Sequence, residues 1–107
     1  MVEAGDSGVK CSRCGRPFRN DERLSAISGE VMGDEYIDSY FLCPDCDVYT
    51  REIYHDRFCG PDETDIVGPL ARADVDKKVK TAKRCKEPWN KKCRCRAHRS
   101  YFGGTLD

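Results

Sequence analysis

The chain has 107 residues, of which 38% are hydrophobic and 36% charged, and its nineteen basic side chains are balanced by nineteen acidic ones. This length allows one small domain, and a core drawn from so polar a sequence would by itself give only marginal stability. The longest apolar run, Tyr40–Cys43, is far too short for a membrane helix, and the first residues lack the layout of a secretory signal. We therefore expect a cytoplasmic protein with no membrane partner.

The two halves of the chain carry opposite charges. Residues 20–76 contain four basic and fifteen acidic side chains, whereas residues 77–102 contain eleven basic side chains and one acidic side chain. Either the halves attract each other within one domain, or the basic segment offers a surface to nucleic acid or another polyanion. We favour the first interpretation, because solvated charged faces are common and the acidic half would repel phosphate.

The predicted elements begin after residues 1–9, which are small and polar and which we expect to form a flexible N-terminus. Over residues 24–42, apolar and polar side chains alternate on both sides of a glycine-containing turn. This pattern predicts a β-hairpin, with Tyr40 on one face of its second strand and Phe41 on the other.

Two helices are predicted after this hairpin. The first would begin at Pro44, with acidic residues in its first turn, and would end at Gly60. The second would carry apolar residues on one face between positions 75 and 82 and would bring Cys85 close to its end. The domain therefore belongs to the α+β class.

Eight cysteines offer another source of stability, either as disulfides or as metal thiolates. In a reducing cytosol, cysteines with two residues between them indicate metal or redox sites before structural disulfides. Two such pairs, with 28 residues between them, are Cys11 with Cys14 and Cys43 with Cys46. Together they would form a four-thiolate tetrahedral site, and zinc fits because it accepts four sulfurs without geometric strain and is redox-silent.

The order of these elements resembles the treble-clef class of zinc fingers. The segment Cys11-Ser12-Arg13-Cys14-Gly15 would be the knuckle, and Cys43-Pro44-Asp45-Cys46 would be the pair at the start of a helix. The resemblance covers about half of the chain and implies a fold and a metal, but no particular activity. Treble clefs serve as nucleic-acid binders, protein adaptors and structural supports.

Rubredoxins offer a competing resemblance. They hold one metal between two Cys-x-x-Cys knuckles at a similar separation, with a proline after the first cysteine of the second pair, as in Cys43-Pro44. Their metal is iron, so this resemblance implies electron transfer. Asp47 stands where a glycine would be expected, and the predicted helix continues past the pair. We take both departures to favour zinc.

A second cluster of metal ligands is predicted near the C-terminus. Three thiols and an imidazole would form a Cys₃His zinc site: Cys85, Cys93, Cys95 and His98. Cys59 could replace His98 as the fourth ligand, or His55 could join instead. A Cys59–His55 couple could also be a nucleophile and its base, but no third orienting group is visible, so we expect Cys59 to be a small buried residue.

Aromatic residues are interleaved with the basic segment. Trp89, Tyr101 and Phe102 would suit the stacking of bases combined with phosphate contacts. In a small domain braced by metal, however, a tryptophan beside the ligands is more often part of the core. We therefore expect Trp89 to be buried.

These patterns predict a small metal-bound α+β domain over residues 10–107, with a treble-clef-like half over 10–60 and a basic half over 61–107 that ends in a metal-braced segment. The expected function is that of a non-catalytic binding or adaptor module with one or two structural Zn²⁺ ions and a protein or nucleic-acid partner. A closed four-ligand zinc leaves no position for water or substrate, which argues against catalysis. The alternatives are nucleic-acid binding through residues 77–102 and electron transfer by a rubredoxin-like iron site.

Overall fold

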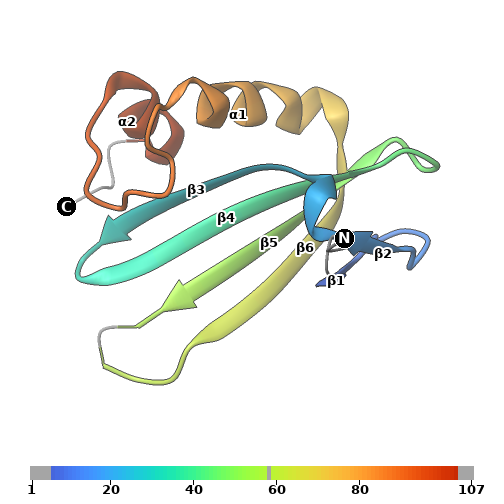
Figure 1. Cartoon of the computed structure of the whole chain (residues 1–107), viewed down its shortest axis with the longest axis horizontal. Coiled ribbons are helices and arrows are strands. Elements are labelled where there is room, and N and C mark those ends of the chain that lie inside the picture. Colours follow the sequence, from blue (N-terminus) through green and yellow to red (C-terminus); the bar gives the residue numbers. More distant parts are fainter. Residues whose placement is uncertain (1–5, 58, 104–107) are drawn as a thin grey trace, which may run out of the picture.

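The computed structural model describes residues 6–57 and 59–103 of the chain. Within these residues a small sheet pairs β1 (Asp6–Lys10) with β2 (Pro17–Arg19), and a short 3₁₀ turn follows at Asn20–Glu22. A large antiparallel sheet has the order β3 (Arg23–Val31), β4 (Asp34–Cys43), β5 (Val48–Asp56) and β6 (Glu63–Ala71). The helices α1 (Arg72–Arg84) and α2 (Arg96–Phe102) lie over one face of this large sheet (Figure 1).

The hairpin predicted over residues 24–42 is confirmed as β3 and β4. These strands pair in antiparallel register down to Val31 opposite Asp34, and the turn between them consists of Met32 and Gly33. Both turn residues have positive φ, 52° and 86°, which is the conformation that a two-residue hairpin turn requires.

The helix predicted from Pro44 to Gly60 is wrong, because this part of the chain contains the strand β5. This strand pairs with β4 without interruption and also pairs with β6. Tyr49 and Ile53 are four residues apart, a spacing that places two residues on one face of a helix and, being even, also on one face of a strand. The segment is rich in β-branched and aromatic residues, and pairing on both sides fixes it as a strand.

The flexible N-terminus predicted over residues 1–9 is corrected in part. Residues 6–9 belong to β1, which pairs with β2, while residues 1–5 lie outside the described part of the chain. Val9 is almost completely buried. A single apolar residue in a polar run has no period that a sequence pattern could reveal.

The second predicted helix is confirmed as α1. Its buried residues are Val75, Val79 and Ala82, and Cys85 follows directly after its last residue. Within the described part of the chain, neither helix is both long and apolar enough to cross a bilayer.

Alternation along β4 divides the core between the two faces of the large sheet. On one face, Tyr40 packs against Tyr49 and against the apolar side of α1. On the other face, Phe41 stacks on Phe18 of the small sheet, with 5.1 Å between the ring centroids, in a cluster that also contains Cys43. The small sheet therefore covers the second face close to the cysteines.

A buried polar network attaches α2 to the large sheet. The Asp38 carboxylate is only 3% exposed and accepts hydrogen bonds from Arg51 Nη2 at 2.6 Å and from the Tyr101 hydroxyl at 2.7 Å. The Tyr101 hydroxyl uses its one hydrogen in the bond to Asp38. The Tyr40 hydroxyl is therefore the donor in its contact with the Tyr101 oxygen, at 2.6 Å. Burial, followed by the charge of Asp38, raises the pKa of Tyr101 well above its usual range.

The variant Tyr101→Phe tests this network. We expect the free energy of unfolding to fall by about 1–2 kcal/mol, because Asp38 loses a donor and Tyr40 loses its acceptor. Urea unfolding followed by circular dichroism measures the change. Tyr36→Phe, whose ring stacks on His55 on the same sheet, is the control and should change stability by less than about 0.5 kcal/mol. An unchanged midpoint for Tyr101→Phe would contradict the network.

Candidate metal centres

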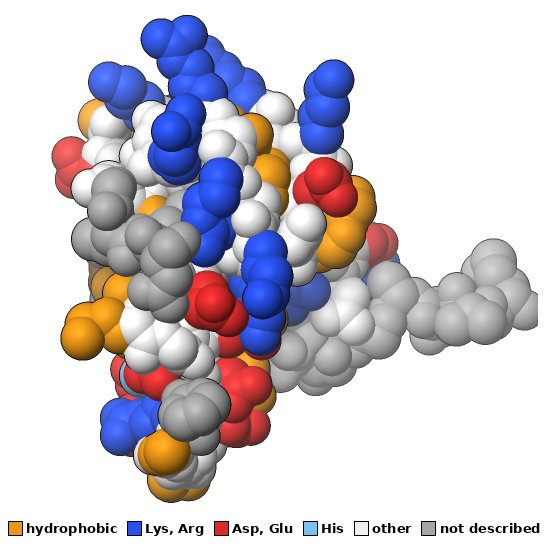
Figure 2. All heavy atoms as spheres, turned by 90° about the vertical axis from the view of Figure 1, so that its left-hand side faces the viewer, with side chains coloured by type: hydrophobic (Ala, Val, Ile, Leu, Met, Phe, Trp, Pro, Cys, Tyr) orange, Lys and Arg blue, Asp and Glu red, His pale blue; other side chains and the backbone are white. Residues whose placement is uncertain are grey.

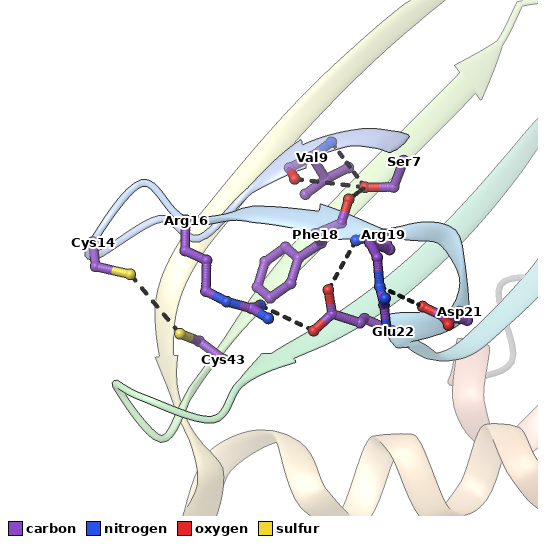
Figure 3. A network of polar contacts seen from close by, with 9 residues as sticks. All are labelled: Ser7, Val9, Cys14, Arg16, Phe18, Arg19, Asp21, Glu22 and Cys43. Carbon is purple, nitrogen blue, oxygen red and sulfur yellow. Dashed lines mark hydrogen bonds and ion pairs between the residues drawn. The ribbon is translucent and has the colours of Figure 1, made fainter. Parts of the chain in front are cut away.

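The first candidate centre lies between two turns that belong to different sheets. The turn with Cys11 and Cys14 joins β1 to β2, and the turn with Cys43 and Cys46 joins β4 to β5. The four Sγ atoms lie within 4.8 Å of one another, and those of Cys14 and Cys43 are 3.9 Å apart (Figure 3). The structure thus brings together the four cysteines that the spacing singled out.

The two turns have the same local geometry. The Gly15 N–H donates to the Cys11 carbonyl and the Asp47 N–H donates to the Cys43 carbonyl, both at 2.9 Å. Gly15 has a φ of 79° and Asp47 a φ of 57°, so the aspartate adopts the left-handed conformation for which a glycine was expected. Asp47 in place of glycine therefore does not favour zinc over iron. The other departure from the rubredoxin pattern was a helix after the second cysteine pair, and the structure has the strand β5 there instead.

Backbone groups and neighbouring thiols set the proton affinity of the sulfurs in this centre. Burial raises the pKa of Cys11, but hydrogen bonds, from the N–H groups of Cys14 and Arg13 and with the Cys14 and Cys43 thiols, outweigh burial and lower it to about 7. The pKa of Cys46 is raised to about 12, first by its contact with Cys14 and then by burial. Four thiolates this close repel one another, and a bound cation would remove that repulsion.

Polar contacts fix the first cysteine turn on the large sheet. The Ser12 N–H donates to Thr50 Oγ1 at 3.0 Å, and the two hydroxyls are 2.9 Å apart. Thr50 is fully buried. On the neighbouring strand, a Cβ at Gly68 would lie 2.3 Å from Ser12 Oγ, so glycine is the residue that lets β6 approach this turn.

The second candidate centre surrounds Cys85, at the end of α1. The Cys85 Sγ lies 3.7 Å from Cys93 Sγ, 3.5 Å from Cys95 Sγ and 3.2 Å from His98 Nδ1. All four ligand atoms lie within 4.8 Å of one another. Burial, as the largest cause, raises the pKa of Cys85 to about 12. The N–H of His98, by donating to Cys95 Sγ at 3.4 Å, lowers the pKa of Cys95.

His98 is oriented by the large sheet. Its side chain is fully buried, and its Nε2 bonds the carbonyl of Ser28 on β3. A carbonyl only accepts, so Nε2 carries the ring proton and the Nδ1 lone pair points at the three sulfurs. A backbone carbonyl that accepts from the second ring nitrogen is one of the usual partners of a metal-binding histidine. Sequence reasoning missed this role of Ser28, since no side-chain pattern marks a backbone carbonyl.

The alternative roles of Cys59 and His55 are not realised. Cys59 is exposed, lies after the end of β5 and belongs to neither cluster. His55 lies on β5, stacks on Tyr36 and has its Nε2 2.8 Å from Asp34 Oδ2. The shared helix face that would have joined the two residues does not exist, and the prediction that Cys59 is buried is wrong.

The prediction that Trp89 is buried is also wrong, because this side chain is 70% exposed. It lies in the segment between Cys85 and Cys93, which is held by turns and by the second cluster. Apolar contacts from the tryptophan are therefore not what orders this segment.

Both clusters could hold a metal ion. Four thiolates, and three thiolates with one imidazole, are ligand sets of structural zinc sites. No protein family, curated protein or solved structure matches this chain. The treble-clef resemblance is not confirmed, since a strand follows the cysteine pair at which that class has its helix.

Proposed function

We propose that the protein is a non-catalytic binding module held together by two structural zinc ions. Each cluster supplies four ligand atoms, which would leave no position for water or substrate on a tetrahedral ion. Thiolate and imidazole ligands suit zinc better than they suit magnesium or calcium. Elemental analysis of the chain purified under reducing conditions should find two zinc atoms per chain, whereas a metal-free folded chain would contradict the proposal.

Iron at the first centre is the second candidate. It is favoured by the matching turns at Gly15 and Asp47, which place two knuckles opposite each other as in the rubredoxin resemblance. A four-thiolate iron would make the protein coloured and redox-active. A colourless preparation with zinc in both centres would exclude electron transfer.

The partner that we propose is a nucleic acid, bound by the cations of residues 77–99, here called the basic surface. The observation that carries this proposal is a difference in ion pairing along the chain. From residue 16 to residue 72, six arginines each have a carboxylate oxygen within 4.0 Å: Arg16, Arg19, Arg23, Arg51, Arg57 and Arg72. The pair of Arg16 with Glu22 can be followed in Figure 3.

The cations of the basic surface are different. Lys91 reaches Glu30 at 3.5 Å. No carboxylate of residues 6–57 or 59–103 pairs with these exposed side chains: Lys77, Lys78, Lys80, Lys83, Arg84, Lys86, Lys92, Arg96 and Arg99. Lys and Arg side chains gather on the upper part of the face in Figure 2, and most Asp and Glu lie below them. These nine cations therefore make no direct ion pair with the carboxylates of the described residues, which supports a polyanionic partner.

Part of the basic surface is hollowed. Arg84, Lys86 and Arg96 line a cavity of about 620 Å³ together with the hydroxyl-bearing residues Thr81 and Ser100, and Glu87 is the one carboxylate among the described residues of its lining. Three cations and two hydroxyls around one hollow are groups that contact phosphate oxygens. The hollow therefore indicates where the phosphate backbone would be held.

Salt titration of binding tests this partner. Affinity for generic RNA and DNA should fall steeply as salt rises, because cations that contact phosphates release counterions. The variant Arg84→Gln/Lys86→Gln/Arg96→Gln should lower the slope of log affinity against log salt by about 2 on a single strand, since each contact contributes about 0.7. Lys10→Gln, an exposed cation on β1, is the control and should leave the slope unchanged. Absence of binding at low salt would contradict a nucleic-acid partner and favour a protein.

A further inference from the structure

Trp89 stands at the tip of a turn within the basic surface. The Asn90 N–H donates to the Glu87 carbonyl at 3.0 Å, which places Pro88 and Trp89 at the two central positions of the turn. Proline presets the backbone at the first of these positions. The turn therefore has a defined shape without any contribution from the indole ring.

The rest of the molecule holds this turn in place. The Ser28 N–H on β3 donates to the Pro88 carbonyl at 2.7 Å. A second turn follows directly, in which the Cys93 N–H donates to the Asn90 carbonyl and the Lys92 N–H donates to Asn90 Oδ1, both at 3.0 Å. Trp89 thus has a fixed backbone and a side chain that remains 70% exposed.

The indole of Trp89 differs from the other large exposed apolar side chains in its chemistry and in its charged neighbours. Leu24, Met32 and Ile66 are aliphatic and lie on or beside strands of the large sheet. Trp89 is aromatic, and three lysines (Lys86, Lys91 and Lys92) lie within three residues of it in the chain, against one carboxylate, Glu87. An exposed aromatic face between cations is the combination that holds single strands, in which bases stack on rings and phosphates contact the positive charges.

We infer that Trp89 stacks on an unpaired base of a single-stranded nucleic acid while the neighbouring cations contact its phosphates. This inference rests on the proposed nucleic-acid partner and specifies the form of that partner. In a duplex the base faces are covered by neighbouring base pairs, so a surface indole finds no face to stack on. The basic surface alone would bind both duplexes and single strands, and Trp89 would add a preference for single strands.

Tryptophan fluorescence tests the inference directly, because Trp89 is the one tryptophan of the chain. Oligo-dT and oligo-U should quench the emission in proportion to binding, and a blunt duplex of the same length should bind without quenching. The comparison of the two single strands distinguishes DNA from RNA as the preferred ligand. Binding of single strands with unchanged emission would overturn the inference.

Variants at the same position separate stacking from charge. Trp89→Ala should weaken single-strand binding about tenfold, leave duplex binding unchanged and keep the salt slope of the unchanged protein. Trp89→Phe should restore most of the affinity, because a phenyl ring also stacks. Both variants should retain the metal content and unfolding midpoint, since the side chain is exposed. If Trp89→Ala binds single strands normally, the inference fails while the proposed partner stands; if the unchanged protein binds neither nucleic acid, the proposed partner itself fails.

Discussion

Replacing Cys14 by serine is expected to remove one metal ion per chain and to lower the free energy of unfolding by on the order of 5 kcal/mol, a large part of the stability of a small domain. Cys14 is exposed, so its own burial contributes little, and a large effect would come from the metal. Its sulfur faces Cys43 across the gap between the two sheets. Without the ion, the small sheet would be held to the large sheet by contacts such as those of Val9, Phe18 and Ser12.

Cys59→Ser is the matched control for this variant. Cys59 is also exposed but belongs to neither cluster, so its replacement should leave the metal content unchanged and stability within about 0.5 kcal/mol. Zinc per chain and urea unfolding are measured for both variants. If Cys14→Ser keeps cooperative unfolding and both ions, the first centre is misassigned.

The second large effect is expected from His98→Gln. Glutamine can still donate to the Ser28 carbonyl but places no ligand where Nδ1 stood, so the variant removes the metal ligand while retaining a donor for that carbonyl. We expect one ion per chain instead of two and a loss of ~3 kcal/mol in the free energy of unfolding. The ion that remains should be the one at the first centre.

His55→Gln is the control for the second centre, since His55 lies on β5 beside Tyr36 and Asp34. It should retain two ions. Elemental analysis and thermal unfolding compare the two variants. Two ions in His98→Gln would mean that another residue completes the site, and the double variant with Cys59→Ser would then identify or exclude Cys59.

The ligand clusters could be predicted from the sequence because short cysteine spacings are a local signal. Two intervening residues place Cys11 near Cys14 and Cys43 near Cys46 within single turns, and the structure brings both pairs together. Metal binding itself, and the identity of the metal as zinc, stay predictions. The hairpin and α1 were also predictable, since alternation and helical spacing each act along one segment.

The assignment of β5 could not be made in this way. Tyr49 and Ile53 satisfy a strand and a helix equally, and the pairing that decides between them involves residues of β4 and β6 far along the chain. The same holds for Trp89, since the turn that carries it is joined to β3 by a hydrogen bond between Pro88 and Ser28, 60 residues apart in the numbering. Such long-range relations leave no periodic trace in a sequence.

The position of Trp89 between Cys85 and Cys93 has a thermodynamic consequence. If an ion at the second centre orders this segment, a ligand that selects the ordered shape would also select the occupied site. By linkage, zinc would raise the affinity for an oligonucleotide by the same factor by which the oligonucleotide raises the affinity for zinc. Recognition by this surface would then follow the supply of the ion in the cell.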